Sequence, residues 1–207
     1  MKPRQPVTQE TAGDSQLSLF GESTEAEPAA DVRPDRAEKA SPVAWALLAA
    51  DAATVESYRA KVYDRGPDRC AFFLGAISSS GHGKLRAGSR TTGTSRVVTA
   101  HVLGYVIANG ADVLPEGHVV RHTCDESSCQ LSSHWVAGER LDNIRDYYAR
   151  SHRAGHALND ARGPDGRATA IRDAILDALA TGADVEAAIA AAIAAGNPSG
   201  VSQDTLG

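Results

Sequence analysis

Long apolar runs are absent from this chain of 207 residues. No segment approaches the roughly 18 apolar residues that a membrane-spanning helix needs, and no secretory signal is visible, so we expect a cytoplasmic protein without a membrane segment. Cysteine is also scarce, because the chain contains only three. An odd number of cysteines in a cytoplasmic protein gives no even set for disulfides, which favours a metal site or free thiols.

Large apolar residues are nearly missing from residues 1–40, which are rich in Glu, Asp, Pro, Ala, Gln and Ser. Such a composition cannot bury enough surface to offset the entropy lost on ordering, so we predict a disordered N-terminal tail. The chain as a whole is long enough for one well-buried domain with appendages, or at most for two small domains.

Basic side chains are missing from residues 173–207, which hold 5 acidic ones. Residues 1–57 are also acidic, with 10 acidic and 5 basic side chains, whereas residues 58–172 hold 16 basic and 11 acidic ones. The net charge of -5 is therefore distributed unevenly, with a basic central segment over 58–172 between two acidic end segments. A basic centre suits a surface that faces DNA, although the same charge is ordinary for a soluble domain.

Two of the three cysteines lie in one short stretch, VRHTCDESSCQLSSHWVAGERLDNIRD. Within it, Cys124, Cys129 and His134 follow one another at intervals of five residues. Thiolates and imidazole suit a tetrahedral zinc ion, and a short loop can be fastened around one. His122 precedes this group, and Asn143 follows it on a segment that reads as a helix. The pair suggests a second, catalytic site beside the metal loop.

These five residues satisfy the pattern His-x-Cys-x4-Cys-x4-His-x8-Asn, and the stretch resembles the HNH, or His-Me finger, nucleases. The likeness is to their phage-type and His-Cys-box homing branch in particular, and it covers about residues 60–155. In that branch an upstream cysteine that opens a strand is the fourth zinc ligand, and CAFFLGAISSSGHG from Cys70 resembles this element. Ala100-His101 matches the "AH" that enters a helix before the finger.

The chain departs from the family pattern at two points. Leu131-Ser132 stands where the family often has Asn-Pro after the second cysteine, and Val102 stands where it often has Arg after the upstream His. The second departure removes a cation that would stabilise the leaving group, which Arg96 or Arg121 can replace. His101 is open to two interpretations: it orients a phosphate or His122, or it caps the interior of its helix.

The resemblance implies a zinc-stabilised ββα-metal core in an α+β fold, with a small antiparallel sheet flanked by helices. It also implies a metal-dependent endonuclease that hydrolyses phosphodiester bonds in DNA. His122 would be the general base and Asn143 would hold a catalytic Mg²⁺. The structural zinc ligands would be Cys70, Cys124, Cys129 and His134, which leave no open position for water.

Several arginines are candidates for contacts with DNA. Arg86, Arg90 and Arg96 surround the segment GSRTTGTS, which reads as a loop, and they either meet phosphates or are simply solvated. Arg121 lies beside His122, and Arg145 lies on the helix after the finger. We expect His82 to be a surface residue.

One apolar island interrupts the N-terminal tail. The pentapeptide formed by Gln16, Leu17, Ser18, Leu19 and Phe20 resembles the motif by which many bacterial DNA-processing proteins dock into the replication sliding clamp. The apolar side chains would fill a groove while Gln16 forms hydrogen bonds at its rim. The other interpretation is a chance apolar cluster, or one that folds back on the domain.

The remaining pattern predicts four regions: a tail over 1–40, a helix over 41–62, the nuclease domain over 63–155 and a helical extension over 156–207. The helix periodicity is clear in GRATAIRDAILDALA, and Asp184 can cap the alanine-rich VEAAIAAAIAAG. This last helix docks either on the domain or on another copy of the chain, so a homodimer stays open.

Two other functions remain possible for the same sequence. One is a catalytically inactive, zinc-stabilised adaptor that binds DNA or the clamp, which the two departures from the family pattern favour. The other is a zinc-stapled module for protein interaction, which would have no affinity for DNA.

Overall fold

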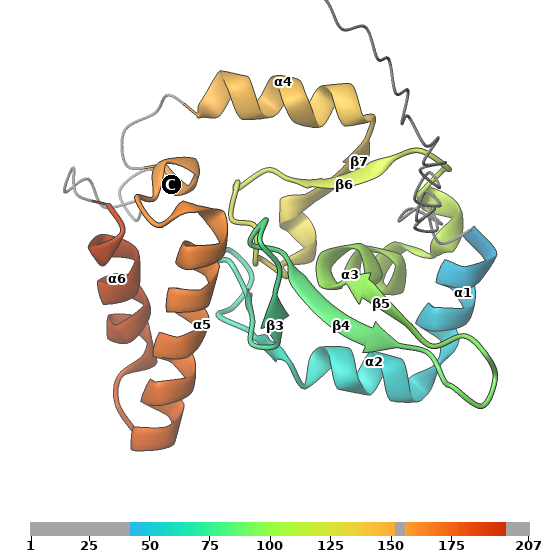
Figure 1. The fold of residues 1–207 in the computed structure, drawn as a ribbon, viewed down its shortest axis with the longest axis horizontal. Coiled ribbons are helices and arrows are strands. Elements are labelled where there is room, and N and C mark those ends of the chain that lie inside the picture. The colour runs from blue at the N-terminus through green and yellow to red at the C-terminus, as the bar shows by residue number, and fades with distance from the viewer. Residues whose placement is uncertain (1–41, 152–155, 198–207) are drawn as a thin grey trace, which may run out of the picture. The chain divides into compact units, whose positions relative to one another are not determined.

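The computed structural model describes residues 42–151 and 156–197, all within the compact unit that spans Lys39–Gly207. This part of the chain is a mixed α+β structure in which helices surround small antiparallel sheets (Figure 1). Its α-helices are α1 (Pro42–Ala50), α2 (Ala52–Arg59), α3 (Ala100–Asn109), α4 (Arg140–Arg150), α5 (Gly163–Thr181) and α6 (Val185–Ala195). Its strands are β1 (Val62–Tyr63), β2 (Phe72–Phe73), β3 (Ala76–Ile77), β4 (Gly83–Ala87), β5 (Arg96–Thr99), β6 (Val119–His122) and β7 (Trp135–Gly138).

The first predicted helix is in fact two helices. Asp51 has an extended backbone, with φ -76° and ψ 108°, and its carboxylate accepts a hydrogen bond from the Thr54 backbone amide. A carboxylate that caps a new N-terminus in this way favours a break over a continuous helix. The prediction of one continuous helix over 41–62 was therefore wrong, because Asp51 separates α1 from α2. The last residue of the predicted range already belongs to β1.

The strands pair in three separate antiparallel sheets. β1 pairs with β2, β3 pairs with β4 and β4 with β5, and β6 pairs with β7. The expected strand CAFFLGAI is divided into β2 and β3, which belong to different sheets. The loop GSRTTGTS joins β4 to β5, as the sequence predicted.

The β6–β7 hairpin leads directly into α4, so two antiparallel strands and a helix follow one another in sequence. Figure 1 shows α4 along one side of this hairpin and α3 along the other, and both helices contact β6. Residues 123–134 form the loop between the two strands. This loop carries the second and third cysteines and His134.

Three clusters of apolar side chains form the core. The first packs α1, α2 and α3 against β4 and β5, around Phe73 and Leu103. The second packs α5 and α6 against β2, through Phe72, Ile175 and Ile189. The third joins α3 to the β6–β7 hairpin through residues that include Trp135. The alanine-rich α6 therefore packs on α5 of the same chain, and contact with another copy of the chain stays a prediction.

No helix in the two described ranges combines the length and the apolar character required to cross a membrane.

Candidate metal centre and histidine cluster

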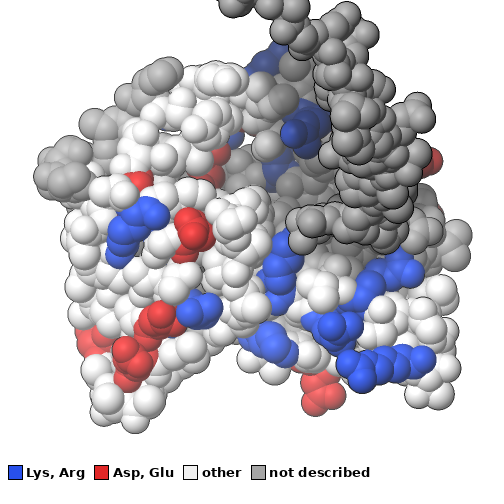
Figure 2. Space-filling model, viewed as in Figure 1, with Lys and Arg blue, Asp and Glu red and all other residues white. Residues whose placement is uncertain are grey.

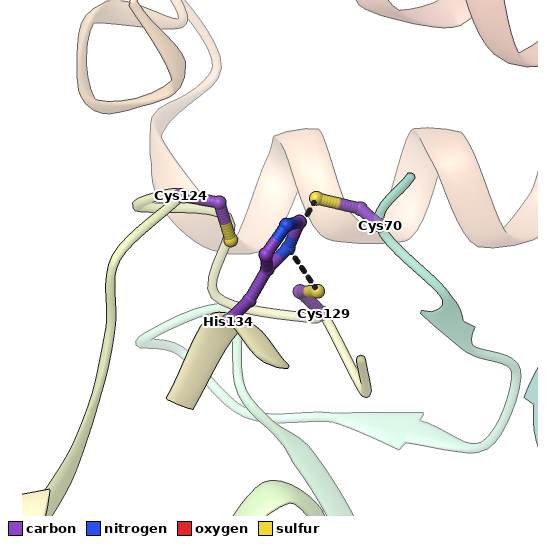
Figure 3. A group of neighbouring side chains, drawn as sticks. All are labelled: Cys70, Cys124, Cys129 and His134. Atoms are coloured by element: carbon purple, nitrogen blue, oxygen red, sulfur yellow. Dashed lines mark hydrogen bonds between the residues drawn. The ribbon is translucent and has the colours of Figure 1, made fainter. Parts of the chain in front are cut away.

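The structure gathers all three cysteines and one histidine into a single group. The ligand atoms of Cys70, Cys124, Cys129 and His134 all lie within 4.8 Å of one another (Figure 3). His134 Nδ1 lies 3.6 Å from the Cys70 sulfur and 3.5 Å from the Cys129 sulfur. A group of three thiols and an imidazole that converge on one point can hold a metal ion such as zinc.

The spacing within the group fits zinc. A tetrahedral ion with bonds of ~2.3 Å to sulfur and ~2.0–2.1 Å to nitrogen holds a sulfur ligand about 3.5 Å from a nitrogen ligand. The distances from His134 Nδ1 to the sulfurs of Cys70 and Cys129, 3.6 and 3.5 Å, agree with that edge length. The two distances are therefore compatible with coordination of one ion by all three atoms.

The three cysteines also influence the ionisation of one another. Interaction with Cys124 raises the pKa of Cys70 and of Cys129, whereas interaction with Cys129 lowers the pKa of Cys124. Three sulfurs this close cannot all ionise by themselves, because thiolates repel one another. A bound metal ion removes this conflict, since it binds the deprotonated form of each cysteine.

Backbone pairing brings Cys70 to the loop, although 54 residues separate it from Cys124. The Gln130 amide donates to the Ala71 carbonyl at 2.7 Å, and the Phe73 amide donates to the Ser128 carbonyl at 3.2 Å. The chain on either side of Phe72 thus pairs with the end of the loop. This pairing places Cys70 beside Cys129.

Two carboxylates anchor the loop to the helices on either side of it. Asp125, which has a positive φ of 55°, forms an ion pair with Arg150 of α4 at 2.6 Å. Glu126 forms an ion pair with Arg167 of α5 at 2.7 Å. The side chains of Glu126 and Arg167 are each only 5% exposed, so the contact is fully desolvated. The metal loop is therefore fixed to both α4 and α5.

His122 ends strand β6 and is buried, and its ring contacts the metal loop directly. Its Nε2 lies 3.0 Å from the Cys129 carbonyl oxygen, so the Nε2–H donates to a residue of the metal group. This hydrogen bond places the ring proton on Nε2 and leaves Nδ1 as the lone-pair nitrogen. Burial lowers the pKa of His122, with the charges of Cys124 and Glu126 acting in the opposite direction.

Two further histidines lie against His122. The ring centroid of His101 is 4.5 Å from that of His122, and the centroid of His82 is 4.9 Å from His101. His101 Nε2 donates to the Val120 carbonyl at 3.0 Å, and burial lowers the pKa of His101 well below its ordinary value. Burial lowers the pKa of His82 to about 4. The expectation that His82 lies on the surface was wrong, because the ring packs in this group and is only partly exposed.

Asn143 lies on α4 and is exposed. Its side chain forms no hydrogen bond with any of the described residues. An exposed carboxamide oxygen of this kind is free to accept an external ligand. Whether it binds a catalytic cation stays a prediction.

The expected DNA-binding arginines have different surroundings. Arg86 on β4 and Arg90 in the following loop are exposed, and Arg96 on β5 is partly exposed. None of these three forms an ion pair within 42–151 and 156–197. Figure 2 shows Lys and Arg side chains gathered where α2, β4 and β5 lie, with acidic side chains mainly over α5 and α6.

The two arginines near the finger are paired with acidic residues of α4. Arg121 forms an ion pair with Asp146. Arg145 lies 3.9 Å from Asp142, at the limit of an ion pair, and remains 70% exposed. Arg121 is therefore less available to a phosphate than the other four arginines.

Lys84 is a candidate that the sequence did not single out. Strand alternation places His82, Lys84 and Arg86 on one face, while Leu85 and Ala87 point into the core. A line of cations thus leads from the histidine cluster along β4. The alternation of polar and apolar residues in GHGKLRA, just after the turn, was the signal that could have identified Lys84.

The motif Gln16–Phe20 lies outside the described residues, as does the whole predicted tail over 1–40. Comparison of the chain with models of protein families, with curated proteins and with solved structures finds no match to any of the three.

Proposed function

We propose that this protein is a metal-dependent DNA endonuclease of the HNH, or His-Me finger, type, built on a zinc-stabilised ββα core. One observation carries the proposal: His122, at the end of β6, donates through Nε2 to the carbonyl of Cys129 in the metal loop. The histidine at the start of the nuclease pattern thus contacts the loop that carries the two cysteines of the pattern, and this contact orients the ring. The strand–loop–strand–helix order of residues 119–150 supports the same proposal.

His122 acts as the general base. Its Nδ1 holds the lone pair, because Nε2 carries the proton. Burial lowers its pKa, so the ring is neutral near pH 7 and able to take a proton from water. A positioned base of this kind contributes a factor of ~10²–10⁴ to the rate.

The group of Cys70, Cys124, Cys129 and His134 holds a structural zinc ion. With four protein ligands, this site has no position for water and takes no part in the chemistry. Its contribution is to fix the Cys129 carbonyl, and through it the ring of His122.

Asn143 binds a divalent cation, for which Mg²⁺ is the first choice, through its exposed carboxamide oxygen. Such an ion, when bound, stabilises the negative charge on the phosphate and on the departing oxygen. With one neutral protein ligand, the affinity for Mg²⁺ is low until DNA supplies phosphate oxygens.

DNA lies over the face of β4 and β5 next to the histidine cluster. Lys84 and Arg86 lead away from His82 on that face, and Arg90 and Arg96 extend the basic surface without carboxylate partners in the described part of the chain. Arg145 is a further contact. Binding of this kind to phosphates is independent of sequence and weakens as the salt concentration rises.

The tail recruits the nuclease to the replication sliding clamp through Gln16, Leu17, Ser18, Leu19 and Phe20. A pull-down with the clamp from the same cell tests this part separately. Replacement of Leu19 and Phe20 by alanine should abolish the retention of the full chain. Equal retention of the wild-type chain and the variant would remove the tether from the proposal.

The nuclease itself is tested by incubation of the full chain with supercoiled plasmid and Mg²⁺. We expect nicks or breaks that EDTA suppresses. DNA binding without cleavage in Mg²⁺, Mn²⁺ or Ni²⁺ would contradict the enzyme and indicate the inactive adaptor. An absence of both binding and cleavage would indicate a zinc-stapled module for protein interaction.

A further inference from the structure

Three histidines from separate parts of the chain form a second possible metal site. His82 precedes β4, His101 lies in the first turn of α3 and His122 ends β6. One ring nitrogen of each lies within 4.8 Å of one ring nitrogen of the other two. None of these three belongs to the group of Cys70, Cys124, Cys129 and His134, and the sequence pattern assigned a metal to none of them.

Within residues 42–151 and 156–197, the hydrogen bonds of these rings leave one nitrogen of each ring without a partner. His101 and His122 donate through Nε2 to the carbonyls of Val120 and Cys129, both at 3.0 Å. His82 Nδ1 lies 2.9 Å from the Ser80 hydroxyl oxygen. A histidine that binds a metal usually forms a hydrogen bond through its second ring nitrogen, and this bond fixes the tautomer and the orientation of the ring.

His101 Nδ1 is buried and has no hydrogen-bond partner among the described residues. Leaving a buried polar atom unpaired is destabilising, so such atoms need an explanation. An ion held at the meeting point of the three rings would supply the missing partner. The residue is 4% exposed, so bulk water has little access to that nitrogen.

We infer that His82, His101 and His122 bind a transition-metal ion, at a site separate from the zinc group. Three neutral imidazoles without a carboxylate favour Zn²⁺, Co²⁺, Ni²⁺ or Cu²⁺ over Mg²⁺, which prefers oxygen. Three protein ligands leave one position open on a tetrahedral ion.

Occupancy of this site has a consequence that rests on the proposed function. The Nδ1 of His122 cannot accept a proton from water while it is bound to a metal ion. An excess of Zn²⁺ therefore competes with the general base and slows Mg²⁺-dependent cleavage at least tenfold.

A titration of the metal-stripped full chain with Co²⁺ tests the site without DNA. The wild-type chain should take up two equivalents, one with intense thiolate-to-cobalt charge-transfer bands and one with ligand-field bands only. His82→Ala should take up one equivalent, with the charge-transfer bands unchanged and the second affinity at least 100-fold weaker. Those bands also report that the variant has folded.

His118→Ala is the matched control, because His118 is exposed and lies outside both groups. It should keep two equivalents. Uptake of a single equivalent by the wild-type chain, or of two by His82→Ala, would overturn the inference. Cleavage that is undiminished by excess Zn²⁺ would overturn the competition at His122. An absence of cleavage in every condition would defeat the proposed nuclease and leave the measured stoichiometry to decide the metal site.

Discussion

The buried ion pair between Glu126 and Arg167 allows a quantitative prediction. Arg167 Nε lies 2.7 Å from the carboxylate of Glu126, and both side chains are 5% exposed. Replacement of Arg167 by methionine keeps much of the volume but leaves the carboxylate of Glu126 buried without its cation. Breaking a buried pair in this way costs about 3–5 kcal/mol. With a urea dependence of ~2 kcal/mol per M, the unfolding midpoint should fall by roughly 2 M.

The double variant Glu126→Gln with Arg167→Met removes both charges and should recover part of this loss. Asp160, the second acidic contact of Arg167, keeps its ion pair with Arg162 at 2.8 Å. Urea unfolding followed by tryptophan fluorescence measures each variant, since Trp135 is buried beside the loop. Arg172→Met on the same helix is the control, and it should cost less than about 1 kcal/mol. A loss for Arg167→Met equal to that of the control, or a double variant no more stable than the single, would refute the reasoning.

Two further predictions concern the metal group and the histidines. Cys70→Ser should weaken zinc binding by more than about 100-fold, because one of four ligands carries about a quarter of a binding free energy of ~10–16 kcal/mol. The zinc content after dialysis against a chelator measures this effect. Full retention of zinc by the variant would contradict the prediction. Burial lowers the pKa of His101 in the folded chain below its unfolded value of ~6.5. Below pH ~6.5 the unfolded chain therefore binds a proton at this residue that the folded chain does not bind, and the folded state loses stability. The free energy of unfolding should therefore fall between pH 7 and pH 5. Below pH ~6.5, this one group contributes up to ~1.4 kcal/mol per pH unit to the fall, and His101→Gln should reduce it. An identical drop in both proteins would contradict the assignment.

Local patterns in the sequence predicted a large part of the structure. The spacing of Cys124, Cys129 and His134 indicated a metal loop, whereas Cys70 was added only through the family resemblance. All four residues meet in the structure. The segment after the loop was expected to be a helix and forms α4, and Asp184 caps α6 as expected, since it accepts hydrogen bonds from the amides of Glu186 and Ala187. Apart from Cys70, these features depend on neighbours in the sequence, which a single chain displays directly.

Features that depend on distant contacts were missed. The approach of His82 and His101 to His122 is set by the packing of β4 and α3 against β6, and no spacing encodes it. The partner of Glu126 lies 41 residues away on α5. In both cases a contact made by folding decided the outcome. Asp51 is different, because its capping of the Thr54 amide is local; it was overlooked because a helical apolar pattern continues across it.

The role of His122 as the general base is tested most directly by plasmid cleavage with His122→Ala. Zinc content, measured on the same samples, reports whether the metal group is intact, and His118→Ala serves as the control at an exposed histidine. We expect a loss of cleavage of ~10²–10⁴-fold in His122→Ala with one structural zinc retained, and full activity in His118→Ala. Cleavage by His122→Ala at the wild-type rate, with its zinc in place, would contradict this role.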